Sequence, residues 1–251
     1  MHLTKLHITS LVLSLSAIPV FNGHADTINI SSDIWCPYIC DENPGYVVEL
    51  TNRAFELMGH EVQFNLMPFN RALLEAQKGN VDAVLAVTPK NLVDHQLHSG
   101  EMKIGLSYND FYTLTTNKWR FTELEDLNQH SVAIISGYDY DAIQDHIDTN
   151  PDAFYLATGE NPLAMNIKRL IRGRFQILLG NRNVISYTSK QLKMGEKIRY
   201  AGSFGTPLPL YIGFSVSKRH YADIFTEGMA KLKANGEYDK ILIKYQIYPF
   251  D

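Results

Sequence analysis

The residues with the most distinctive chemistry lie in one loop, W-C-P-Y-I-C, which runs from Trp35 to Cys40. Trp35 and Tyr38 each combine a flat apolar ring with a polar edge, and Pro37 restricts the backbone between them. The alternating apolar run over 28–34 predicts a strand that ends in this loop, and helical spacing follows the loop. Because α/β proteins usually bind ligands where a strand's carboxyl end opens into a loop, we expect both aromatic residues to contact a ligand. The alternative is that they only cap the core.

Three further candidates lie in the next α/β segment. Arg71 opens a predicted helix directly after Pro68 and Phe69, beside a strand end, where a guanidinium can hold an anion and Phe69 can pack against it. Thr88 ends a nearly all-apolar strand, and its hydroxyl can donate to the same ligand. A solvated surface arginine and an ordinary strand end are the alternative interpretations.

The second half of the chain contributes two candidates at strand ends. Tyr138 lies in an S-G-Y-D turn ahead of a helix predicted over 138–147, where free backbone amides can hold an anion. Asn181 lies in a G-N-R-N cluster that can donate to a ligand or simply cap a helix. No Ser-His-Asp order, metal-ligand spacing or paired carboxylates indicate a catalytic residue, a metal or a cofactor, so we assign none. The expected ligand-binding residues are Trp35, Tyr38, Phe69, Arg71, Thr88, Tyr138 and Asn181.

The first 25 residues have the pattern of a cleavable signal peptide, with Lys5 before an apolar core and small residues at the cut. The apolar core is too short for a stable membrane span. The protein is therefore expected in the periplasm. In that oxidising compartment the two cysteines of the chain, Cys36 and Cys40, are expected to form a structural disulfide.

Composition and charge narrow the class of protein further. Removing residues 1–25 from the 251 leaves 226, enough for one large domain or two modest ones. Without Lys5 the chain keeps 22 basic and 27 acidic side chains, a net charge of −5. No basic stripe is available to neutralise phosphates, so a nucleic-acid partner is not expected.

The order of elements predicts an α/β fold in two units, each a mostly parallel sheet flanked by helices. A strand–helix–strand rhythm runs to Val87 and starts afresh over 131–192. Long extended segments near 106–116 and 205–214 would join the two units as a hinge. The expected divisions are a signal peptide 1–25, lobe 1 from 26–113 plus 208–251, and lobe 2 from 114–207.

Six motifs follow one another along the chain: G-Y-V-V-E-L, R-A-L-L-E-A-Q-K-G-N-V-D-A, L-E-D-L, G-R-F-Q-I-L-L-G-N, L-Y-I-G-F-S-V and L-K-A-N-G-E-Y-D-K-I-L. In this order they resemble the family 3 bacterial extracellular solute-binding proteins, over essentially the whole chain after residue 25. The resemblance implies a two-lobed, Venus-flytrap periplasmic binding protein that closes on a small ligand. It implies no enzymatic activity, and an inner-membrane ABC permease as partner. By analogy with such binders, the protein is expected to be a monomer.

The chain also departs from the family's amino-acid binders. Those proteins usually carry an arginine shortly after the threonine that matches Thr88, and this chain has Asn91 near that position. They also usually carry an aspartate at the end of a later strand, and this chain has Gly180 and Asn181 there. Without these charges a free α-amino acid loses its main anchors, so we expect another small polar or anionic organic ligand. The W-C-P-Y-I-C loop, Trp119-Arg120 and G-Y-D-Y are similar to a subgroup of solitary exported proteins.

Two alternative functions share the expected fold. The closed form can signal to a membrane sensor instead of a permease. The fold has also been adopted by periplasmic dehydratases of prephenate-like acids, which need a cleft acid; Glu49 and Asp139 are the nearest candidates for that role.

Overall fold

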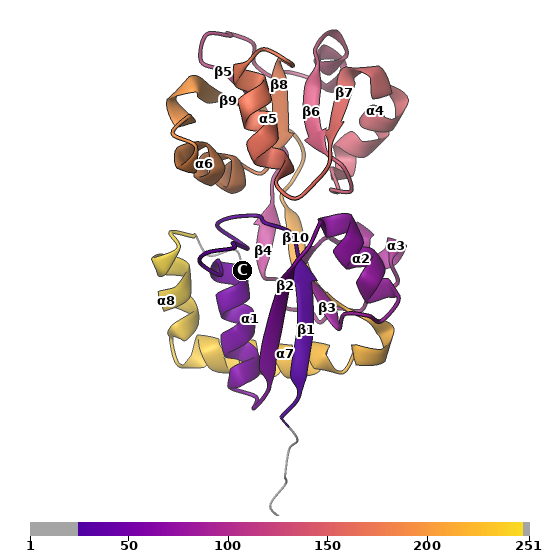
Figure 1. The fold of residues 1–251 in the computed structure, drawn as a ribbon, viewed down its shortest axis with the longest axis vertical. Coiled ribbons are helices and arrows are strands. Elements are labelled where there is room, and N and C mark those ends of the chain that lie inside the picture. Colours follow the sequence, from indigo (N-terminus) through magenta and orange to yellow (C-terminus); the bar gives the residue numbers. More distant parts are fainter. Residues whose placement is uncertain (1–24, 248–251) are drawn as a thin grey trace, which may run out of the picture.

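The computed structural model describes residues 25–247, which form two lobes stacked along the long axis of the molecule (Figure 1). The expected signal peptide, residues 1–25, lies almost entirely outside the described residues. Each lobe is a sheet flanked by helices, so the predicted two-lobed α/β fold is confirmed.

Lobe 1 is built on a five-stranded sheet with the order β2-β1-β3-β10-β4. β1 runs parallel to β2 and β3, whereas β10 runs antiparallel to β3 and β4. The strands are β1 Thr27–Ser32, β2 Glu61–Leu66, β3 Ala83–Val87, β4 Gly105–Ser107 and β10 Leu208–Phe214. The apolar side chains of β3 are buried on both faces, as is usual for a central strand, and Ile28 and Ile30 of β1 are buried on one face.

Helices cover both faces of this sheet (Figure 1). They are α1 Tyr46–Glu56, α2 Phe69–Gln77, α3 Pro89–Asp94, α7 Tyr221–Ala234 and α8 Glu237–Lys244. α1 and α7 pack closely because Gly228 has no side chain: a Cβ there would lie 2.2 Å from the Ala54 carbonyl oxygen. Phe55 of α1 contacts Phe214, Tyr221 and Phe225 in the same core.

Lobe 2 contains a second five-stranded sheet, ordered β7-β6-β8-β5-β9. β6 runs parallel to β7 and β8, and β5 runs antiparallel to β8 and β9. The strands are β5 Asp110–Leu114, β6 Val132–Ile135, β7 Phe154–Ala157, β8 Ile177–Gly180 and β9 Ile198–Ser203. The α-helices are α4 Gln144–Thr149, α5 Pro162–Ile171 and α6 Arg182–Gln191. Short 3-10 helices span Leu124–Gln129, Asp141–Ile143, Pro151–Ala153, Gly195–Lys197 and, in lobe 1, Val216–Lys218.

The chain crosses between the sheets twice, from β4 to β5 and from β9 to β10. The expected lobe boundary after residue 113 falls inside β5, which pairs with β8 and β9. Asp110 explains why β5 joins lobe 2: its buried carboxylate accepts hydrogen bonds from the Arg182 backbone and guanidinium. Among residues 25–247, no helix is long and apolar enough to span a bilayer.

One local prediction was wrong, and one strand was missed. The helix expected over 138–147 begins as a 3-10 turn at Asp141 and becomes α-helical only at Gln144, so Tyr138 and Asp139 lie in an irregular loop. β9, over 198–203, was not predicted, because its R-Y-A-G-S sequence lacks a clear apolar alternation. It forms an edge of the lobe 2 sheet through pairing with β5.

Candidate functional site

A small cavity lies between the lobes at the carboxyl ends of β1 and β3, with a volume of about 40 Å³. Lobe 1 contributes most of its wall, and Tyr138 and Asp139 close it from lobe 2. The lining residues are Asp33, Trp35, Phe69, Ala86, Thr88, Asn91, Ser107, Tyr138, Asp139 and Leu210. Two carboxylates, three aromatic rings and several neutral hydrogen-bonding groups therefore meet at one point between the lobes.

Asp33 follows the last residue of β1, which places its carboxylate at the strand end under the cavity. Its side chain is buried, and its Oδ2 accepts a hydrogen bond of 2.7 Å from the Tyr138 hydroxyl. Burial raises the pKa of Asp33 to about 7, although the hydrogen bond from Tyr138 acts in the opposite direction. With this pKa, the carboxyl group of Asp33 titrates near neutral pH.

Tyr138 reaches from lobe 2 into the aromatic wall of lobe 1. Its ring meets Trp35 and Phe69 edge-on, with ring centroids 6.4 Å and 5.7 Å apart. Burial, followed by the nearby Asp33 carboxylate, raises its pKa well above that of an ordinary tyrosine, so the hydroxyl stays protonated and donates. The phenol of Tyr138 thus occupies space beside Trp35 and Phe69, between the two lobes.

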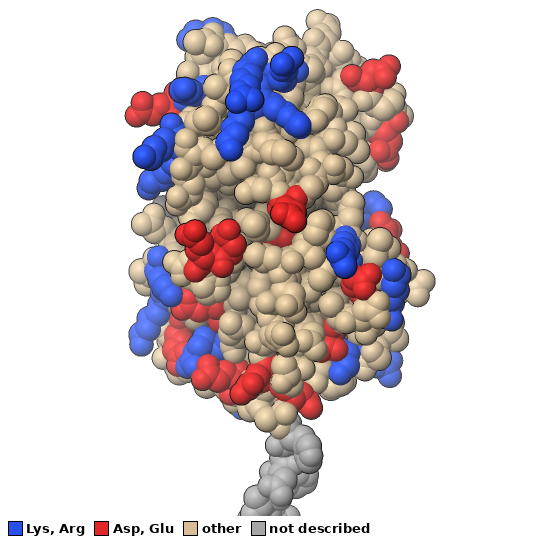
Figure 2. Space-filling model, in the orientation of Figure 1, with Lys and Arg blue, Asp and Glu red and all other residues tan. Residues whose placement is uncertain are grey.

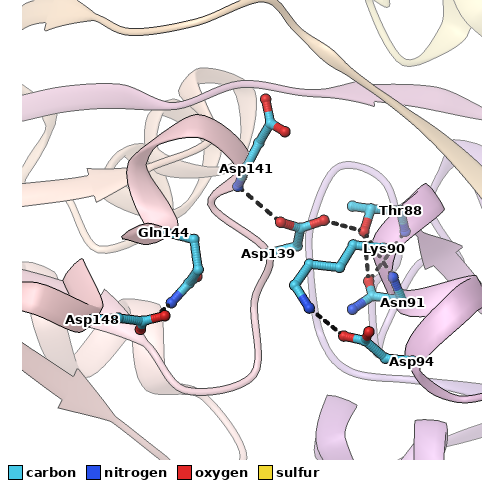
Figure 3. Close-up of polar contacts among 8 residues, drawn as sticks. All are labelled: Thr88, Lys90, Asn91, Asp94, Asp139, Asp141, Gln144 and Asp148. Atoms are coloured by element: carbon cyan, nitrogen blue, oxygen red, sulfur yellow. Dashed lines mark hydrogen bonds and ion pairs between the residues drawn. The ribbon is translucent and has the colours of Figure 1, made fainter. Parts of the chain in front are cut away.

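A second bridge between the lobes joins Thr88 to Asp139 (Figure 3). Thr88 caps α3 in a capping box with Asn91, which fixes the threonine hydroxyl at the cavity edge. That hydroxyl donates to Asp139 Oδ2, while Asp139 Oδ1 accepts from the Asp141 backbone N–H at 2.8 Å. The loop after β6 therefore supplies both lobe-bridging residues.

Gly137 brings this loop against α2 of lobe 1. Its φ of +81° lies in the left-handed region, and a Cβ would lie 1.6 Å from the Asn70 Oδ1 atom. The positive φ favours a glycine here, and a Cβ would fit only if the exposed Asn70 side chain turned away.

Tyr38 and Asn181 lie on the hinge side of the cavity and do not line it. The Tyr38 hydroxyl donates to the Leu106 carbonyl oxygen at 2.8 Å and accepts from Asn183 Nδ2 at 3.0 Å. Asn181 caps α6 through its side-chain oxygen, and its Nδ2 donates to the same Leu106 carbonyl. Burial raises the pKa of Tyr38 to about 12. Both side chains thus tie the W-C-P-Y loop and α6 to Leu106 of β4, just before the first crossover.

Arg71 also lies outside the cavity. It is exposed on α2 and borders a separate groove that it shares with Glu160 of lobe 2. The predicted disulfide between Cys36 and Cys40 is confirmed, with a Cα–Cα distance of 5.0 Å. It faces another groove at the lobe boundary, where Asp41 and Glu42 also lie.

Several lining residues were not among the expected ones. Asp33 is a polar residue directly after an apolar strand, a signal that was present in the sequence but outweighed by the neighbouring aromatic residues. Ser107 and Leu210 come from the crossover strands, and only the fold brings them to the cavity. Ala86 has a φ of +60° in the middle of β3, opposite the irregular register of β10, so the strand is distorted where it borders the cavity.

The charged side chains that line the cavity are both acidic. No lysine or arginine is among the cavity-lining residues, and Lys90 nearby pairs with Asp94 on α3 (Figure 3). Figure 2 shows acidic side chains at the lobe boundary on the face in view, and a group of basic side chains further up on lobe 2. Glu49 lies away from the cavity and accepts hydrogen bonds from Lys244 and Tyr245. Within residues 25–247, no cluster of three or more His, Cys, Asp or Glu side chains is arranged to hold a metal ion.

Comparisons with known proteins relate the fold to binding proteins. No family model and no curated protein sequence matches the chain. Among solved structures, a histidine kinase sensor domain with similarity to periplasmic binding proteins matches with a TM-score of 0.74 at 19% identity, over 89% of this chain and 98% of that one. A putative L-cystine ABC transporter protein from Listeria monocytogenes matches with a TM-score of 0.73 at 18% identity, over 88% and 96%.

An ancestral amino acid-binding protein, a precursor of cyclohexadienyl dehydratase, also matches, with a TM-score of 0.69 at 18% identity, over 87% of this chain and 94% of that one. The similar structures are mostly solute-binding proteins of the amino-acid-binding type, and at these identities they establish the architecture. The chain has the two-lobed α/β fold of the periplasmic binding proteins.

Proposed function

We propose that this protein is an exported solute-binding protein that encloses a small polar organic molecule between its lobes and delivers it to an ABC permease. The observation that supports this function most directly is the cavity at the lobe boundary, whose walls come from both lobes. We further propose that it acts in the periplasm as a monomer and belongs with the solitary W-C-P-Y-containing binding proteins of family 3.

Closure would follow from contacts that only the closed form can make. Tyr138 with Asp33, and Asp139 with Thr88, join groups from opposite lobes. A ligand that touches both walls adds contacts between the lobes, or replaces one of these bonds with its own, and so shifts the population toward the closed form. The two crossovers between the sheets are the places where the backbone can bend.

Among the candidate residues, we propose that Trp35, Phe69, Thr88 and Tyr138 contact the ligand, because they line the cavity. Tyr38 and Asn181 would act indirectly, by positioning the W-C-P-Y loop and α6. The position of Arg71 outside the lining argues for a role at the rim rather than as the central anion clamp.

A thermal-shift screen of the protein without residues 1–25 tests this function. The screen would include amino acids, amines, organic acids and small peptides, since any ligand that binds the folded state raises the melting temperature. Small-angle scattering with the best ligand should show a smaller radius of gyration. Trp35→Ala should abolish both responses, whereas the exposed surface variant Asp223→Asn should keep them. A ligand that binds the Trp35→Ala variant equally well would place the binding site elsewhere.

A sensing role is the second candidate, and the histidine kinase sensor domain of the same fold supports considering it. In that role the closed form would bind a membrane sensor instead of a permease. Co-purification of the ligand-bound protein from membranes, with identification of the captured partner, separates the two roles.

We propose that the protein is not an enzyme. One of the similar structures is a precursor of a dehydratase, so a dehydratase activity is the alternative to test. Asp139 would be the candidate acid there, because it lines the cavity whereas Glu49 does not. Turnover of prephenate by the purified protein would contradict our proposal.

A further inference from the structure

The chemistry of the cavity wall points to the class of ligand. Asp33 and Asp139 line it from opposite lobes, and the lining contains no lysine or arginine. An anionic ligand would therefore enter between two carboxylates without a cation to pair with. A buried charge left without a partner costs several kcal/mol, so the cavity disfavours a carboxylate or phosphate.

We infer that this cleft selects a small organic amine that carries no carboxylate, with Asp33 as the partner of the ammonium group and Trp35 and Phe69 packing against the apolar body. The inference rests on the proposed function and specifies the ligand class of the same site. Aromatic rings around an ammonium group favour it further through their negative faces. Asn91 and Ser107 add neutral polar side chains to the wall for a polar substituent of the body, whereas the Thr88 hydroxyl already donates to Asp139.

Tyr138 shows what the lobe 1 half of the site accepts. Its side chain is an apolar ring with a hydrogen-bond donor at one end; the ring lies against Trp35 and Phe69, and the donor lies on Asp33. An aryl or alkyl amine has the same arrangement of body and donor. The remaining cavity of about 40 Å³ holds little more than ordered water, so such a ligand must displace the Tyr138 phenol.

The surroundings of the cleft agree with a cationic ligand. Asp41 and Glu42 line one groove at the lobe boundary, and Glu160 lines another together with Arg71. Figure 2 shows several acidic side chains along this boundary, with basic side chains at one side of it. Carboxylates around a cleft raise the local concentration of cations and speed their association.

Matched probes test the inference. Isothermal titration calorimetry would compare 2-phenylethylamine with 2-phenylethanol, which lacks the charge, and with phenylalanine, which adds a carboxylate; cadaverine and lysine form an aliphatic pair. We expect at least one amine to bind, and to bind at least tenfold more tightly than its alcohol or amino-acid counterpart. Binding of the amino acid at least as tight as that of its amine, or failure of both amines to bind, would overturn the inference.

Variants separate the roles of the two lobes. Asp33→Asn should weaken amine binding at least tenfold, whereas the exposed Asp223→Asn control, which removes the same charge far from the cleft, should not change it. Tyr138→Phe keeps the ring but frees Asp33, so we expect about tenfold tighter amine binding. The proposal that the ammonium group replaces the Tyr138 hydroxyl on Asp33 would be contradicted by an unchanged amine affinity in Asp33→Asn. A weaker amine affinity in Tyr138→Phe would contradict it too.

A further readout distinguishes a charge partner from a residue that only maintains the fold. When an ammonium group binds at pH 6, the Asp33 carboxyl group should lose close to one proton to the buffer while the ammonium keeps its charge. Titrations in buffers of different ionisation enthalpy measure this proton. Tyr138 and Asp139 are the other titratable groups in the cavity wall. Release of the same number of protons by the Asp33→Asn variant would overturn the pairing. If instead a carboxylated solute closes the lobes in a Trp35-dependent way, the amine class is wrong but the proposed binding function stands.

Discussion

Replacement of Asp33 by asparagine should remove a pH dependence of stability that this residue imposes on the ligand-free protein. The carboxyl group is buried in the cavity wall and receives one side-chain hydrogen bond, from Tyr138. An asparagine in the same place has nearly the same shape and can accept the same bond, but it has no proton to lose. The variant therefore isolates the ionisation of one group.

The sign and size follow from the two states of the carboxyl group. Its pKa is about 7 in the folded protein and 3.8 as the ordinary value. Between these limits the folded protein binds more protons than the unfolded chain, so the contribution of Asp33 to the free energy of unfolding falls as the pH rises. The full difference is about 4 kcal/mol, of which about 3 kcal/mol is lost between pH 5 and pH 8.

Urea unfolding at pH 5 and pH 8, followed by both fluorescence and circular dichroism, measures this contribution. Other titrating groups change the stability of both proteins alike, so the quantity of interest is the difference between wild type and Asp33→Asn. We expect the wild type to lose about 3 kcal/mol relative to the variant over this range. Coincident transitions of the two probes are needed, because two lobes can unfold in separate steps.

The exposed Asp223→Asn variant serves as the control, since it removes one carboxylate outside the cavity. Its pH dependence should follow that of the wild type. If wild type and Asp33→Asn show the same pH dependence, Asp33 is ionised and solvated in the folded protein, and the reasoning is refuted.

Three other predictions concern how the lobes are built and joined. Gly137→Ala would put an alanine at a φ of +81° and push the Asn70 side chain aside, so we expect the free energy of unfolding to fall by about 1 kcal/mol in urea titrations. An equally stable variant would contradict the left-handed backbone at this position. Arg182→Ala would remove the guanidinium from the buried Asp110 carboxylate and leave it one backbone N–H donor. We expect the free energy of unfolding in urea titrations to fall by about 2 kcal/mol, and by less if water takes the place of the guanidinium. Gly228→Ala would bring a methyl group within 2.2 Å of a carbonyl oxygen of α1. We expect thermal unfolding to show a loss of about 2 kcal/mol in the free energy of unfolding, and an equally stable variant would rule out this close helix contact.

Much of the fold could be predicted because its signals are local. The helix over 221–234 follows its apolar spacing, and the buried strand that ends at Val87 follows its apolar run. β9 escaped prediction because an edge strand buries few side chains, and the helix expected from Tyr138 was displaced because Tyr138 and Asp139 turn toward lobe 1 instead. Local propensity gives way where contacts across the molecule are stronger.

The candidate site was less predictable than the fold. Trp35, Phe69, Thr88 and Tyr138 were identified from their places at strand ends, and all four line the cavity. Arg71 has an equivalent place in the sequence, yet its helix turns it to the surface. A position in the sequence fixes which end of a strand a residue occupies, but not the direction of its side chain.

The sequence by itself determined the α/β alternation, the two-lobed order of elements and the pairing of the two cysteines, because these depend on spacing and on short loops. Only the tertiary structure decided the chemistry of the cleft. Asp33 and Tyr138 are 105 residues apart, and their hydrogen bond exists because lobe 2 closes on lobe 1. Burial of a charge is a property of that assembled environment, so the acidic character of the cavity could not be read from composition or from any local motif.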